Sequence, residues 1–145
     1  MARPTVCAIF AGLLMFALAP QVRAGDGCSV ADLNGDYSFV LSGTFVGVGP
    51  VAAAGETIYN GDGTAEGVIW VSLNGNQYSG DWTATYTAPS AHSPICSFAK
   101  TITVTTGGLM GQKLNFFITA GDDLKELRFV ETDPGTAVTG TARKQ

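Results

Sequence analysis

The chain alternates between large apolar residues and small or polar ones with a period of two. Between Tyr37 and Val46, the side chains of Tyr37, Phe39, Leu41 and Phe45 share one parity, and most residues of the other parity are serine, threonine or valine. Successive side chains of a β-strand point to opposite faces, so this pattern predicts a strand with one buried face.

Seven further segments of similar length follow, with turn-forming residues between them. Asn-Gly and Asp-Gly pairs at 60–63 and 74–75 favour tight hairpins, because these residues tolerate positive φ angles. Turns rich in glycine or aspartate follow at 107–108, 121–123 and 133–135. The segments predicted as strands are Val51–Tyr59, Gly67–Leu73, Tyr78–Thr87, Cys96–Thr105, Lys113–Thr119, Glu126–Glu131 and Ala137–Arg143.

Eight short strands joined by tight turns predict an all-β fold. We expect a single eight-stranded antiparallel up-and-down barrel, because closure removes both exposed strand edges. A two-sheet β-sandwich is the alternative, although its crossovers usually need several long loops. This chain has one long connection, Ala88–Ile95. Residues Val30–Leu33 are expected to form a short helical turn before the first strand.

The first 24 residues have the features of a secretory signal peptide. Arg3 precedes an apolar run from Val6 to Leu18, and Val22 and Ala24 are the small residues that a signal peptidase reads. We therefore expect 1–24 to be a removed leader and 25–145 to be an exported β-barrel domain, periplasmic or extracellular. No later apolar run is long enough for a transmembrane helix, so no membrane span is expected after cleavage.

Cleavage would change the cysteine count and the charge balance. Cys7 belongs to the leader, and the remaining Cys28 and Cys96 are expected to form a disulfide in an oxidising compartment. The leader holds two of the eight basic residues and none of the twelve acidic ones, so the net charge moves from −4 to −6. No basic stripe is present, and nucleic-acid binding is not expected.

Lys100 is the most informative charged residue. It shares the parity of the apolar residues between Cys96 and Val104, so its amine is predicted to lie inside the barrel with Glu56 or Glu131 as partner. The alternatives are a change of parity at a bulge, or a lysine side chain that reaches out of the barrel mouth.

The aromatic residues in the predicted strands are numerous enough to fill or line a barrel; they include Tyr37, Phe39, Phe45, Tyr59, Trp70, Trp82, Tyr86, Phe98, Phe116 and Phe129. The run of small residues at 51–55 leaves space against one wall, or packs against a bulky ring opposite. The residues predicted to bind a ligand are Lys100, Glu56, Tyr86 and Trp70.

No catalytic residue, metal site or cofactor is predicted. His92 is the one histidine and is expected to be exposed in the long loop, whereas a structural zinc site needs three or four histidine or cysteine ligands. Residues 60–63 with Glu66 lack the ligand spacing of a calcium-binding loop, and no glycine-rich segment precedes a helix as in a phosphate-binding loop.

Two segments carry a resemblance to known proteins. Cys28 is followed by Leu33-Asn34-Gly35-Asp36-Tyr37-Ser38-Phe39, and the chain ends with Thr132-Asp133-Pro134-Gly135 and Thr139-Gly140-Thr141-Ala142-Arg143. Together with 60–67 and 85–87, they resemble a group of small exported bacterial proteins of unknown activity. The resemblance implies a bacterial exported protein and says little about chemistry.

A Gly-x-aromatic motif on the first strand and an arginine on the last are similar to those of lipocalin and calycin barrels. The resemblance implies that Gly35 and Tyr37 close the barrel floor beneath Arg143, with Tyr37 in place of the lipocalin tryptophan. Avidin-type barrels are similar in size. Their biotin-contacting tryptophan pattern is not visible, because the only tryptophans are Trp70 and Trp82.

These observations rank three functions. The leading expectation is non-catalytic binding of a small apolar or amphipathic ligand inside the barrel. The alternatives are a protein-binding module, such as an exported protease inhibitor or surface interaction protein, and a cyclase or isomerase that uses Lys100, Glu56 and Tyr86.

Overall fold

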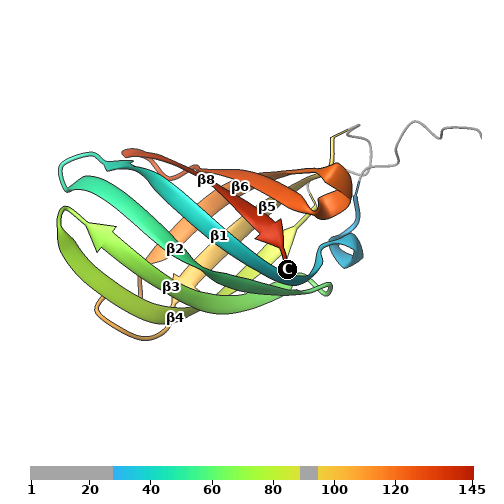
Figure 1. Ribbon diagram of the computed structural model, residues 1–145, viewed down its shortest axis with the longest axis horizontal. Coiled ribbons are helices and arrows are strands. Elements are labelled where there is room, and N and C mark those ends of the chain that lie inside the picture. Colours follow the sequence, from blue (N-terminus) through green and yellow to red (C-terminus); the bar gives the residue numbers. More distant parts are fainter. Residues whose placement is uncertain (1–27, 89–94) are drawn as a thin grey trace, which may run out of the picture.

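A computed structural model describes residues 28–88 and 95–145. Its eight strands form a closed barrel in which each strand pairs antiparallel with the next and β8 returns to β1 (Figure 1). The predicted up-and-down barrel is confirmed, and the two-sheet sandwich is wrong. The predicted leader and His92 lie outside the described residues.

The strands start and end close to the predicted positions. They are β1 (Asn34–Phe45), β2 (Gly49–Asn60), β3 (Thr64–Leu73), β4 (Asn76–Thr87), β5 (Ser97–Val104), β6 (Lys113–Gly121), β7 (Glu126–Glu131) and β8 (Thr136–Lys144). Most differences are extensions by a few residues, because the backbone pairing continues into the polar residues beside each turn.

The two ends of the barrel differ. At one end lie the short 3-10 helices η1 (Val30–Asp32) and η2 (Asp122–Leu124), together with the C-terminus, on the right in Figure 1. Cys28 and Cys96 form the predicted disulfide there, with a Cα–Cα distance of 4.9 Å. We call this the closed end. The opposite, open end is formed by the turns at 46–48, 74–75, 105–112 and 132–135.

Large aromatic side chains fill the interior near the closed end. The rings of Tyr37 and Tyr59 meet edge to face at 5.4 Å, and those of Tyr59 and Tyr86 at 5.3 Å. Phe98 and Leu33 are fully buried beside them. Towards the open end the core changes to smaller side chains, with Val51, Ala53, Val71 and Val138 forming a second cluster. This change in residue size leaves space in the open half of the barrel.

Candidate functional site

The open half of the barrel contains an apolar cavity of about 330 Å³, which we call the cup. Its volume is within the range of small-molecule binding sites. Ala53, from the run of small residues at 51–55, is part of the wall. The lining residues are Leu41, Phe45, Val48, Val51, Ala53, Ile69, Val71, Leu73, Val104, Leu109, Gln112, Leu114, Phe116, Glu131 and Val138.

A smaller pocket of about 50 Å³ lies deeper in the barrel. It shares Leu41, Ile69 and Phe116 with the lining of the cup and also contacts Trp82 and Lys100. A pocket of this size holds only a few water molecules, so a ligand body fits the cup and not the deep pocket.

Lys100 projects into this deep pocket, as the parity of its strand predicts, and is 6% exposed. Its Nζ donates a hydrogen bond to the hydroxyl of Tyr59 at 3.1 Å. It also lies 4.3 Å from the ring centroid of Trp82 and 4.6 Å from that of Tyr59. Burial lowers the pKa of Lys100 to about 7. The two rings and one hydroxyl offset part of the cost of burying its charge.

Glu131 is the second buried charged side chain, 5% exposed at the end of β7. Both carboxyl oxygens are buried without a hydrogen-bond partner. Burial, and to a smaller extent the nearby charge of Asp133, raise the pKa of Glu131 to about 7. Phe116 on β6 pairs with Lys100 on one side and Glu131 on the other, so the predicted Lys100–Glu131 ion pair does not form.

Tyr86 faces inward, but its hydroxyl is hydrogen-bonded to backbone groups at the closed end. Its hydroxyl donates to the carbonyl of Leu33 at 2.8 Å and accepts a hydrogen bond from the backbone N–H of Gly61 at 3.0 Å. Tyr86 therefore anchors the N-terminal segment to the β2–β3 turn and does not line the cup.

Two other predicted ligand-binding residues lie on the outer face. Side chains of β2 alternate between the two faces. Thr57 and Tyr59 point inward, so Glu56 and Ile58 are exposed on the outer face. Trp70 is 59% exposed on β3. Neither residue shares the barrel interior with Lys100. The tryptophan inside the barrel is Trp82. Its ring packs directly against Gly67, and a Cβ atom at that position would lie only 2.5 Å from the ring.

Gly35 and Tyr37 lie together at the closed end of the barrel, and the cation beside them is not the expected Arg143. Tyr37 is fully buried, and its hydroxyl donates to the carbonyl of Leu124 at 2.7 Å. The cation above its ring is Lys144, whose Nζ lies 5.8 Å from the ring centroid. The side chain of Lys144 passes close to Gly35, where a Cβ atom would lie 2.9 Å from its Cε. Lys144 is the direct cross-strand neighbour of Tyr37.

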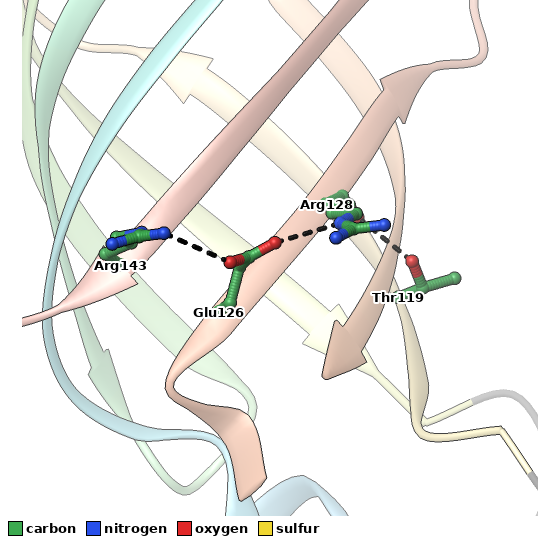
Figure 2. Close-up of polar contacts among 4 residues, drawn as sticks. All are labelled: Thr119, Glu126, Arg128 and Arg143. Carbon is green, nitrogen blue, oxygen red and sulfur yellow. Dashed lines mark hydrogen bonds and ion pairs between the residues drawn. The ribbon is translucent and has the colours of Figure 1, made fainter. Parts of the chain in front are cut away.

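Arg143 does not lie over Tyr37, in contrast to the expectation. Its side chain is 78% exposed on the outer face, with a guanidinium nitrogen 3.5 Å from a carboxylate oxygen of Glu126. Figure 2 shows this ion pair between Arg143 and Glu126. Glu126 also forms an ion pair with Arg128 at 2.9 Å. The lipocalin-like role predicted for Arg143 requires a side chain that points into the barrel. On β8, Ala142 points inward and Arg143 therefore points outward.

The outer wall carries a shallow hollow formed by β1, β6, β7 and β8. Val40 is 58% exposed there, and Phe117 and Val130 are each 40% exposed. The protein-binding hypothesis expects an exposed apolar patch, and these three side chains are exposed apolar residues of this hollow.

The described residues show neither a metal cluster nor a spanning helix. Within 28–88 and 95–145, no three histidine, cysteine, aspartate or glutamate side chains are grouped to hold a metal ion. None of the helices in these ranges has the length and apolarity needed to cross a bilayer.

Comparison with known proteins identifies relatives in fold and not in sequence. No protein-family model matches this chain, and no curated protein does. One similar solved structure is a redesigned β-barrel, with a TM-score of 0.52 and 18% identity over 82% of this chain and 96% of that one. Another is the redesigned β-barrel mFAP1 bound to DFHBI, with a TM-score of 0.52 and 17% identity over 80% of this chain and 98% of that one. At these identities the likeness shows the barrel fold alone.

Proposed function

We propose that this chain is an exported protein that binds a small apolar or amphipathic ligand in the cup, without catalysis. The cup carries the proposal: about 330 Å³ of space lies inside a closed barrel behind a mainly aliphatic and aromatic wall. A well-packed protein core leaves few voids larger than a water molecule, so a cavity of this volume calls for an occupant. The redesigned barrel mFAP1, which was solved with DFHBI bound, supports the proposal as an example of this fold with a small ligand.

Export is supported by the Cys28–Cys96 disulfide, because such bonds persist mainly in oxidising compartments. The enzyme hypothesis has less support. Of its three named groups, Glu56 lies on the outer face and the hydroxyl of Tyr86 is occupied by backbone groups. Lys100 alone remains in the interior near the cup.

Binding is tested with N-phenyl-1-naphthylamine, a neutral probe whose fluorescence rises in apolar surroundings. We expect saturable enhancement by the wild-type protein and loss of this signal in Ala53→Phe, whose added ring would fill the cup. Ala52→Phe is the matched control, because Ala52 is exposed on the outer face of the same strand. The proposal fails if the probe does not bind, or if the two variants bind it equally well.

A further inference from the structure

Glu131 is the charged residue in the lining of the cup. Its carboxyl oxygens have lost contact with water and have no protein hydrogen-bond partner in exchange. A buried polar group in this state costs free energy in both its neutral and its ionised form. Native proteins satisfy most such groups, so this carboxyl group points to a partner that arrives with the ligand.

The charges around the cup favour a cation as that partner. In the four turns of the open end, at 46–48, 74–75, 105–112 and 132–135, Asp133 is the one charged residue. Its carboxylate is held in place by the backbone N–H and side-chain amide of Asn115, at 2.8 and 2.7 Å. Asp133 therefore places a second negative charge near Glu131, and this pair of carboxyl groups favours a positively charged ligand.

The lysines nearest to Glu131 along the strands do not neutralise it. Lys100 lies beyond Phe116, with its Nζ bonded to Tyr59. Lys113, at the start of β6, is exposed on the outer face. No ion pair reaches Glu131 from either residue, so no lysine of the protein takes the place of a ligand cation at its carboxyl group.

Resting on the proposed function, we infer that the ligand of the cup carries a basic amine that binds Glu131 while its apolar body fills the remaining space. The ammonium group donates charge-assisted hydrogen bonds to the carboxylate oxygens, which are stronger than those between neutral groups. A ligand with a carboxylate at the same position is rejected, because it places a third negative charge beside Glu131 and Asp133.

Protonation of Glu131 gives this inference a second signature. Its pKa of about 7 means that the free protein carries the carboxyl group partly protonated at neutral pH. An alkylammonium ion stays charged between pH 6 and 8, as lysine does in water. Affinity for the amine therefore rises over this range as Glu131 loses its proton. Asp133 is the charged group that acts on Glu131, and Lys100 is the other buried charged side chain of the described residues.

The inference is tested with four ligands of one skeleton: n-butylbenzene, 4-phenylbutan-1-ol, 4-phenylbutylamine and 4-phenylbutanoate. Each competes with N-phenyl-1-naphthylamine for the disulfide-intact protein. We expect the amine to bind about tenfold more tightly than the carboxylate, which corresponds to about 1.4 kcal/mol. Glu131→Gln should reduce this ratio to about one to two, because it removes the charge and keeps the shape. Glu56→Gln, on the outer face, should leave the ratio unchanged.

The outcomes separate this inference from the proposed function. If n-butylbenzene binds in the cup but the amine binds no more tightly than the carboxylate, the inference is overturned and the proposed function stands. An amine preference that survives Glu131→Gln overturns the inference as well. If none of the four ligands displaces the probe and Ala53→Phe does not affect probe binding, both fail. If Glu131→Gln does not fold, the pH series on the wild-type protein decides, and amine affinity that does not rise between pH 6 and 8 contradicts the inference.

Discussion

Lys100 and Glu131 face the barrel interior from the same row of the wall, with Phe116 between them and no ion pair joining them. Strands in a sheet lie about 4.8 Å apart, so two strand spacings separate the two backbones. Each group is therefore buried as a single charge. The free energy of unfolding should therefore depend on pH through both groups. Glu131 should lower it as the pH rises towards neutrality, and Lys100 should raise it as the pH rises above neutrality.

Glu131 is expected to destabilise the protein as the pH rises from about 4.5 to 7. Its folded-state pKa of about 7 lies above the ordinary 4.5, so the native state binds more protons than the unfolded state in this interval. The unfolding free energy should fall by roughly 2 kcal/mol across it. Urea unfolding at half-unit pH steps measures this loss. Glu131→Gln should flatten the curve, while Glu56→Gln should keep it.

Lys100 is expected to produce the opposite trend above neutrality. Its folded-state pKa of about 7 lies below the ordinary 10.5, so the unfolded state binds more protons between these values and stability rises with pH. The gain should be roughly 3–5 kcal/mol up to about pH 10. Lys100→Met should remove the rise, and Lys113→Met, at an exposed position, should not. A flat curve for the wild-type protein from pH 7 to 10 would contradict the buried charge.

Reduction of the disulfide should weaken the fold without weakening ligand binding. Cys28 and Cys96 are 68 positions apart, and cross-linking a loop of this length restricts the unfolded chain by about 4 kcal/mol in the chain-entropy model. The double variant Cys28→Ser/Cys96→Ser should lose free energy of this order in chemical denaturation. The cup lies at the other end, so probe affinity below the unfolding transition should change by less than about twofold. A large loss of affinity in the folded variant would show that the two ends are coupled.

Tyr86→Phe should cost stability through the two backbone groups that it leaves unpaired. The carbonyl of Leu33 and the N–H of Gly61 both bond to this buried hydroxyl. Loss of such partners costs about 1–3 kcal/mol. Tyr78→Phe, at a half-buried position beside the open end, is the control and should change the unfolding midpoint far less. Equal effects of the two substitutions would argue against the anchoring role of Tyr86.

The strand pattern was readable from the sequence because most strands have one apolar face. The parity of 96–104 correctly indicated that Lys100 points inward, and the glycine-rich pairs located the hairpins. Between Gly67 and Leu73 the parity is less informative, because Val68, Ile69, Trp70 and Val71 are all large and apolar. The outward position of Trp70 follows only from its register opposite Ala54 on β2.

The site itself depends on relationships among strands that a single sequence does not display. Glu131 was identified only as a partner for Lys100, and its unpaired state becomes visible once Phe116 is found between them. Tyr59 and Trp82 belong to the aromatic residues of the predicted strands, but their contact with Lys100 requires β2, β4 and β5 to meet around one amine. Lys144, and not Arg143, lies above Tyr37 because the register of β1 and β8 pairs Tyr37 with Lys144 and Ser38 with Arg143.

The pairing of β8 with β1 has a consequence for synthesis of the protein. The residues of β8 pair with β1 and complete the ring of strands, and the backbone N–H of Gln145 donates to the carbonyl of Asp36 at 2.9 Å beside this pairing. Until they are available, a growing or truncated chain has two unpaired strand edges, which readily pair with other chains. Loss of β8 should therefore convert the closed barrel into an open sheet that is prone to aggregate, because closure of the whole fold depends on this strand.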